Sequence, residues 1–189
     1  MSKVSSRQLA GIKVFSALQE SALLSISPVF GLHAFTRGQT IITHGERTSS
    51  VYFVSSGRVR ATMFSPAGRE VSYQDIGPGE MFGELAALDQ LPRSTHVIGL
   101  SDGELLTVGR EDFNRLLISH PSVSNAVLLK MAGLVRFLCD RLYEYSALSV
   151  AERLRAELVR LARLQNTPAG QPIVINDMPT HEELANRLA

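Results

Sequence analysis

The stretch from residue 35 to residue 110 is cut by glycines into segments that are too short for helices and rich in β-branched and aromatic residues. Gly57, Gly68 and Gly79 lie eleven residues apart, a spacing typical of strand-plus-turn units in a compact all-β domain. The segments read TIITHG, VYFVSSG, RVRATMF, EVSYQDIG, STHVIGL and ELLTVG. A β-roll or barrel is therefore predicted for this part of the chain.

Helices are predicted on both sides of the β region. Apolar residues from Phe15 to Ile26 recur at helical intervals, and Pro28 ends that pattern. After the β region, residues 111–118 read as a short helix, ended by His120 and Pro121.

A long helix is predicted next, over residues 123–148. Apolar side chains follow two interleaved seven-residue steps, the a and d positions of a heptad repeat. These positions are Leu128, Met131, Val135, Leu138, Leu142 and Tyr145. Because this stripe is narrower than the face that a globular core usually takes, we expect it to form a dimer interface. A stripe packed on its own domain is the alternative.

The C-terminal part is predicted to be mainly helical. Residues 150–165 have an apolar side and a charged side, as expected of a second amphipathic helix. A loop is predicted at 166–172, followed by a short strand, IVIN, at 173–176. The last helix is expected to begin after Thr180, since Glu183 stands three residues further on, at the spacing of a capping box.

Composition excludes several classes of protein. No uninterrupted apolar run approaches the roughly 20 residues that span a bilayer, and the N-terminus lacks the apolar core of a secretory signal. We therefore expect a cytoplasmic protein with no membrane partner. The single cysteine, Cys139, excludes an internal disulfide framework. A formal net charge of +1 means that any binding of nucleic acid must depend on a local element.

The motifs of common enzymes and metal sites are missing from the sequence. The five histidines are scattered, without the spacing of metal ligands, so no metal is expected. The sequence has neither a Ser-His-Asp signature nor a G-x-S-x-G elbow. We therefore expect a protein that is not an enzyme.

The segment GELAALDQLPRST suggests a binding site for a sugar phosphate. Gly83 allows close approach of the backbone, and a helical turn after it would present free N–H groups to an anion. Arg93 offers a planar fork of donors to phosphate oxygens, and Ser94 adds a hydroxyl. A carboxylate at Glu84 would repel phosphate but would accept a hydrogen bond from a ribose hydroxyl. The alternative is a surface ion pair between Glu84 and Arg93 that closes a loop.

This pattern resembles the phosphate-binding cassette of cyclic-nucleotide-binding domains in bacterial catabolite-activator-type transcription regulators, and the resemblance covers nearly the whole chain. It implies an α+β fold: a jelly-roll-like β-roll in residues 1–122, a dimerisation helix in 123–148, and an incomplete winged helix-turn-helix in 149–189. It also implies that Gly83, Glu84, Arg93 and Ser94 contact the ribose and the cyclic phosphate. Leu85 and Ala86 are expected to line the same turn.

The sequence departs from the family where the base is recognised. Members that bind cAMP commonly place threonine and serine on the long helix, where this chain has Leu138 and Cys139. Neither offers a good hydrogen bond, so the base is expected to be held mainly by apolar contact, with Arg136 or Arg141 near in sequence. Thr95 is expected to reshape the pocket. The ligand is thus cAMP or cGMP.

The last residues imply a role in DNA binding. MPTHEELANRLA resembles the first helix of a helix-turn-helix, which makes Thr180 and His181 candidate DNA contacts. The helix that would enter the major groove is absent, so we expect the sequence to be part of a longer protein. Residues 166–172 occupy the place of a loop that contacts RNA polymerase in relatives; a plain linker is the alternative.

The function expected from the resemblance is allosteric control of transcription. Nucleotide binding would set the orientation of two DNA-binding domains across a homodimer. Two alternatives remain: a nucleotide-binding module that controls a protein partner, and a family member that senses a different effector.

Overall fold

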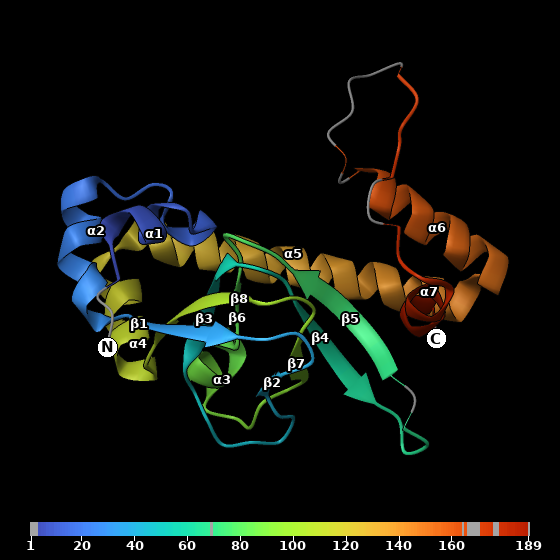
Figure 1. The fold of residues 1–189 in the computed structure, drawn as a ribbon, viewed down its shortest axis with the longest axis horizontal. Coiled ribbons are helices and arrows are strands. Elements are labelled where there is room, and N and C mark those ends of the chain that lie inside the picture. The colour runs from blue at the N-terminus through green and yellow to red at the C-terminus, as the bar shows by residue number, and fades with distance from the viewer. Residues whose placement is uncertain (1–3, 69, 164, 166–170, 176–177, 189) are drawn as a thin grey trace. The chain divides into compact units, whose positions relative to one another are not determined.

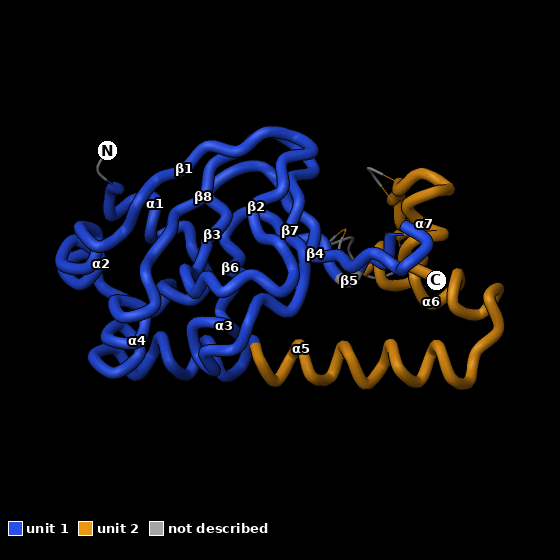
Figure 2. Tube along the Cα trace, turned by 90° about the horizontal axis from the view of Figure 1, so that it is seen from below, with its two compact units in different colours: residues 1–130 blue, residues 131–189 orange. Residues whose placement is uncertain are grey.

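The computed structural model describes residues 4–68, 70–163, 165, 171–175 and 178–188. They fall into two compact units, unit 1 (residues 1–130) and unit 2 (residues 131–189), coloured separately in Figure 2. Unit 1 contains the strands and the first helices, and unit 2 contains the C-terminal helices (Figure 1). The predicted domain limits, 1–122, 123–148 and 149–189, stay a prediction.

The N-terminal segment is helical but broken into short pieces. They are α1 (Ser6–Ala10), a 3₁₀ turn (Lys13–Phe15), α2 (Glu20–Ile26) and a second 3₁₀ turn (Ser27–Val29). The prediction of one helix from Phe15 to Ile26 is thus wrong for its first residues. Phe15 is fully buried, with its ring 5.7 Å from that of Phe30 and 5.2 Å from that of Phe53. This packing takes precedence over the helical spacing of the sequence.

Each of the six segments predicted as strands contains one. The strands of unit 1 are β1 (Gly31–Phe35), β2 (Thr40–Ile42), β3 (Val51–Ser56), β4 (Val59–Phe64), β5 (Glu70–Ile76), β6 (Met81–Phe82), β7 (His96–Gly99) and β8 (Gly103–Val108). The sequence pattern missed β1 and β6. β6 has only two residues, and β1 has no run of β-branched residues.

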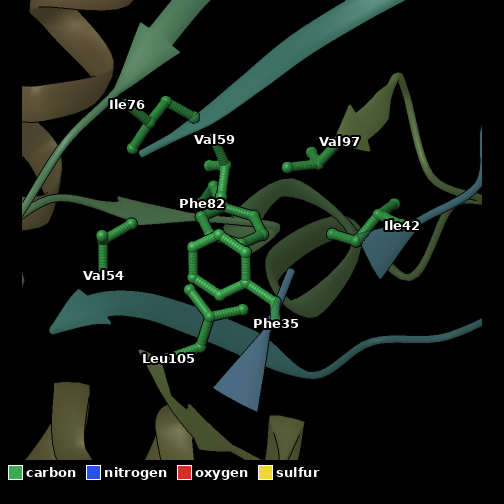
Figure 3. Close-up of a cluster of buried hydrophobic side chains, with 8 residues drawn as sticks. All are labelled: Phe35, Ile42, Val54, Val59, Ile76, Phe82, Val97 and Leu105. Atoms are coloured by element: carbon green, nitrogen blue, oxygen red, sulfur yellow. The ribbon is translucent and has the colours of Figure 1, made fainter. Parts of the chain in front are cut away.

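The strands form two four-stranded antiparallel sheets, ordered β1-β8-β3-β6 and β2-β7-β4-β5. The eight side chains of the core between them come one from each strand (Figure 3): Phe35, Ile42, Val54, Val59, Ile76, Phe82, Val97 and Leu105. All of them are 6% exposed or less. This is the two-sheet arrangement expected of the predicted β-roll.

Glycine is required at the predicted turns. Gly57 has a φ of +78°, and a Cβ there would lie 2.5 Å from the carbonyl oxygen of Asp102. The other glycines with positive φ are Gly38, Gly45, Gly68, Gly79 and Gly83. The prediction that glycines terminate the strands is confirmed.

Helices follow the sheets in unit 1. α3 (Glu84–Asp89) lies between β6 and β7, and α4 (Arg110–Ser119) confirms the helix predicted at 111–118. α5 (Pro121–Ala147) begins two residues before the predicted limit, at a proline, which the first turn of a helix tolerates. Its first part is anchored in unit 1, because Val123 and Val127 are buried there.

The predicted dimer stripe on α5 is largely exposed. Leu128, Val135 and Leu142 are 67%, 59% and 68% exposed, and Leu138 is 46% exposed. Met131 is half-buried. Tyr145, 37% exposed, differs from the others because its hydroxyl accepts a hydrogen bond from Arg141. The role of the stripe as an interface stays a prediction.

Unit 2 contains α6 (Val150–Arg163) and α7 (His181–Leu188), as predicted. Both begin with a capping box. The backbone N–H of Thr180 donates to a carboxylate oxygen of Glu183 (2.9 Å), and the N–H of Glu183 donates to Oγ1 of Thr180 (3.2 Å), as predicted. Ser149 and Glu152 do the same for α6. The Ser149 hydroxyl, which donates to Oε2 of Glu152 (2.7 Å), and the Ser149 N–H, which donates to the same oxygen, lower the pKa of Glu152.

Charged side chains join the helices of unit 2. Glu157 of α6, 4% exposed, forms ion pairs with Arg141 of α5 (3.8 Å), with Arg160, and with Arg187 of α7 (3.0 Å). Glu144 of α5 forms ion pairs with Arg141 (3.1 Å) and Arg160 (2.6 Å). Arg141, which the sequence offered as a candidate base contact, is therefore engaged within unit 2.

The strand predicted at 173–176 is not found over 173–175. Ile173 and Val174 are 51% and 67% exposed, and within the described ranges no strand pairs with them. A β-branched run forms a strand only when it has a neighbour to pair with. Residues 166–170 of the predicted loop and Asn176 lie outside the described residues.

Candidate functional site

The candidate site is built on the turn between β6 and α3. Gly83 makes this turn with a φ of +79°, in the left-handed region where a side chain is strained. A Cβ there would lie 2.8 Å from Nη1 of Arg93 and 3.2 Å from the carbonyl oxygen of Ser50. Gly83 therefore allows the backbone to reach the arginine.

Arg93 is buried, 3% exposed, and held by hydrogen bonds in three directions. Its Nε donates to Oγ1 of Thr48 (2.9 Å), Nη1 to the carbonyl oxygen of Gly83 (2.8 Å), and Nη2 to that of Ser50 (2.8 Å). A guanidinium has five N–H groups, so five minus these three leaves two, one on each terminal nitrogen. The guanidinium is thus fixed in place but keeps two N–H donors for an anion.

The surroundings of Arg93 hold its backbone in place and leave its guanidinium charged. Its N–H donates to the carbonyl oxygen of Glu46 (2.9 Å), and its carbonyl accepts from the N–H of Gly45 (2.9 Å). Tyr52 stacks on Phe82 with 5.1 Å between ring centroids, and the Arg93 guanidinium lies 5.8 Å from the Tyr52 ring. Burial lowers the pKa of Arg93, but a guanidinium in a protein stays charged.

Glu84, the first residue of α3, is 4% exposed. Its Oε1 accepts a hydrogen bond of 2.6 Å from Nζ of Lys130 on α5. Its Oε2 is buried and has no hydrogen-bond partner. Buried polar atoms without partners are rare, because removing them from water costs free energy that no contact returns. Oε2 is therefore an acceptor that a ligand hydroxyl would satisfy.

The other predicted contacts surround this pair. Ala86 is buried, Leu85 is 36% exposed, Ser94 is exposed and Thr95 is half-buried. Ser94 thus follows the buried Arg93 directly at an accessible surface. The structure brings Gly83, Glu84 and Arg93 together in unit 1. Their roles toward a ligand, and those of the neighbouring residues, stay predictions.

Leu138 and Cys139, the predicted base contacts, belong to unit 2. Both side chains are exposed on α5. Their role against a nucleotide also stays a prediction.

Sequence reasoning missed the residues that hold the site in place. One feature of the sequence pointed to Lys130: it is the only charged residue between Pro121 and Val135. No feature of the sequence pointed to Thr48 or Ser50, because a hydroxyl and a backbone carbonyl in a polar loop are not distinctive.

Two surface hollows lie near the site, but neither is lined by Glu84 or Arg93. One, of about 190 Å³, is lined by Arg47, Thr48, Ser49, Ala86, Gln90, Leu91 and Arg110. The other, of about 330 Å³, is bordered by β1, β2, β3 and β8 and includes Ser50 and Tyr52. Glu84 and Arg93 are 4% and 3% exposed, so the site is largely closed to solvent.

Comparisons with known proteins show the family of the chain. Residues 32–120 match the model of the family described as "Cyclic nucleotide-binding domain". The crystal structure of the Thermus thermophilus catabolite activator protein is 30% identical, covers 91% of this chain and 78% of its own, and has a TM-score of 0.64. The chain belongs to the catabolite-activator family of transcription regulators.

Two further relatives show how far the likeness extends. The CRP-like cAMP-activated global transcriptional regulator of Mycobacterium tuberculosis is 27% identical over 94% of this chain and 79% of its own length. Isozyme 1 of the cGMP-dependent protein kinase of Drosophila melanogaster is 32% identical, over 58% of this chain and 15% of its own. Likeness to the catabolite-activator regulators thus covers nearly the whole of this chain, whereas likeness to the kinase covers a little over half of it.

Proposed function

We propose that this chain is the sensor part of a dimeric, DNA-binding transcription regulator that responds to cAMP. One observation supports the proposal most directly: Oε2 of Glu84 is buried without a partner, and the carbonyl of the preceding residue, Gly83, accepts a hydrogen bond from the Arg93 guanidinium. A molecule with a hydroxyl and an anionic group side by side would satisfy both.

A cyclic nucleotide has this chemistry. Its ribose 2'-hydroxyl would donate to Oε2 of Glu84, and its phosphate oxygens would accept from the two remaining N–H groups of Arg93. Ser94 would add a hydroxyl donor from the accessible side. We favour cAMP over cGMP because the mycobacterial relative, similar over most of its length, is cAMP-activated. A role for Leu138 and Cys139 toward the base stays a prediction.

The exposed stripe of α5 supports a homodimer. Its leucines and valine leave a row of apolar surface in contact with water, which a second copy of α5 would cover. Ligand binding would favour one arrangement of the two helices and so set the DNA-binding domains, with Thr180 and His181 near DNA. A DNA-binding regulator of this kind would act in the cytoplasm, and contact of residues 166–172 with RNA polymerase stays a prediction.

A membrane role for α5 is less well supported. By length and composition α5 is apolar enough to cross a membrane, with a mean hydropathy of 1.4 over its best 18-residue window. However, Val123 and Val127 are buried against unit 1, and Lys130 forms an ion pair with the buried Glu84. A helix that packs on a folded unit in this way is better explained as part of that unit.

The alternative of a module that controls a protein partner has support from matches to protein kinases and their regulatory subunits, among them the Drosophila kinase. That match covers 58% of this chain, whereas the Thermus structure covers 91%. α6 and α7 are better explained as the beginning of a DNA-binding domain.

Calorimetric titration of the chain with cAMP, cGMP and 5'-AMP tests the proposal. We expect saturable binding of cAMP with one site per chain, weaker binding of cGMP, and little binding of 5'-AMP. Glu84→Gln should weaken the binding of cAMP, and Glu111→Gln, which changes an exposed carboxylate on α4, should not. Absence of binding by either cyclic nucleotide would refute the sensor function.

A further inference from the structure

Lys130 and Glu84 form an ion pair between α5 and α3. The two residues are 46 positions apart in the sequence, and Nζ lies 2.6 Å from Oε1. The carboxylate side chain is 5% exposed and the lysine side chain is 31% exposed. The lysine therefore reaches a buried charge from a position that remains partly in water.

No other hydrogen-bond donor among the described residues serves the Glu84 carboxylate. The hydrogen bonds of the Arg93 guanidinium go to Thr48, Gly83 and Ser50, so it acts on Glu84 only through space. A buried carboxylate without a counter-ion is costly, and a paired one is tolerated. Lys130 thus supplies the counter-charge of the buried Glu84 carboxylate.

The ion pair also makes the two carboxylate oxygens unequal. Oε1 is occupied by the ammonium group, whereas Oε2 is buried and unpartnered. A carboxylate fixed through one oxygen cannot turn freely, so its second oxygen keeps one direction. A hydrogen-bond donor of the ligand must therefore approach Oε2 from that direction.

We propose that Lys130 is a positioning residue for sugar recognition: it fixes Glu84 through Oε1 so that Oε2 is left for the ribose 2'-hydroxyl. This inference rests on the proposed function, because it assigns the Glu84 carboxylate to the sugar. Lys130 itself does not contact the ligand. Its effect is selectivity for nucleotides that carry the 2'-hydroxyl over those that lack it.

The position of Lys130 adds a consequence for signalling. Lys130 lies on the helix that carries the exposed apolar stripe, two residues after Leu128 and five before Val135. Sugar recognition therefore depends on a residue of α5 itself, and the local position of α5 at Lys130 is tied to Glu84.

The test compares two variants of Lys130 with the parent, each with two ligands, and uses the whole chain. Dissociation constants for cAMP and 2'-deoxy-cAMP are measured by calorimetry for the parent, Lys130→Met and Lys130→Arg. Methionine keeps an unbranched apolar stem but removes the charge, and arginine keeps the charge. Lys13→Met is the matched control, because Lys13 forms an ion pair with Glu80 (3.0 Å) that lies at the surface of the same unit.

The parent and Lys13→Met should bind cAMP about tenfold to a hundredfold more tightly than 2'-deoxy-cAMP, the range expected for one hydrogen bond to a charged group. In Lys130→Met this ratio should fall to near one, with the loss on the cAMP side. Lys130→Arg should recover part of it. A purely structural role would weaken both ligands equally and leave the ratio unchanged.

Three results would overturn the inference: an unchanged ratio in Lys130→Met, tighter binding of cAMP by that variant, or no recovery by arginine in a folded protein. If Lys130→Met fails to fold, the ratio in Lys130→Arg decides, because a ratio equal to one there also contradicts the inference. A parent that binds no cAMP refutes the proposed function, whereas a parent that binds it without regard to Lys130 refutes only the role of the lysine.

Discussion

The carbonyl oxygen of Gly83 accepts a hydrogen bond of 2.8 Å from Nη1 of Arg93, at the position where any β-carbon on residue 83 would collide with the same nitrogen. The turn and the arginine are therefore compatible only while residue 83 is glycine. The first prediction follows from this relationship.

Gly83→Ala should lower the affinity for cAMP by about tenfold or more, because displacing the fork loses at least one charged hydrogen bond. It should also destabilise the fold by roughly 1–2 kcal/mol, the cost of a left-handed backbone at a residue with a side chain. Calorimetry and thermal unfolding measure the two effects. Gly77→Ala is the control, since no atom lies within 4 Å of a Cβ there. Equal affinity in both variants would contradict the role of Gly83.

Arg93→Lys should bind cAMP at least about tenfold more weakly, although the charge is kept, because an ammonium group cannot replace a fork that donates in three directions. The carbonyls of Gly83 and Ser50 would lose their partners, so the free energy of unfolding should also fall, by about 1–3 kcal/mol. The measurements are titration and urea denaturation. Arg47→Lys, which changes an exposed arginine, should have little effect on stability. Parental affinity in Arg93→Lys would show that its planar fork is not needed.

Glu157→Gln should destabilise unit 2, by about 1–3 kcal/mol, because it removes the carboxylate charge shared by the buried Arg141 and the half-buried Arg160 and Arg187. Chemical denaturation followed by far-ultraviolet circular dichroism measures the loss. Glu182→Gln, an exposed residue in the first turn of α7, should cost less than about 1 kcal/mol. Equal stability of the two variants would show that the buried ion pairs contribute nothing net.

Leu138→Glu should convert the dimer to monomers in sedimentation experiments, since a charge would enter an apolar seam. Tyr143→Glu is the control. Tyr143 is 64% exposed but lies off the stripe, so its variant should stay dimeric. A dimer that persists in Leu138→Glu would place the interface elsewhere.

The β-roll could be predicted because its turns require glycine, and regularly spaced glycines can be recognised directly in the sequence. The site could be predicted in part for a similar reason: Gly83-Glu84 and Arg93-Ser94 are close in sequence and chemically unusual together. Lys130 could not be predicted as their partner, because only the folded chain brings α5 against α3. The break before α2 was missed because Phe15 packs against Phe30 and Phe53, residues distant in sequence.

The carboxylate of Glu157 serves arginines from α5, α6 and α7, and Glu144 serves two of the same set. Replacing any one member of this group removes ion pairs from its partners, so substitutions at these positions should be coupled. Across homologous sequences, positions 141, 144, 157, 160 and 187 should consequently covary, each pattern of signs changing as a block.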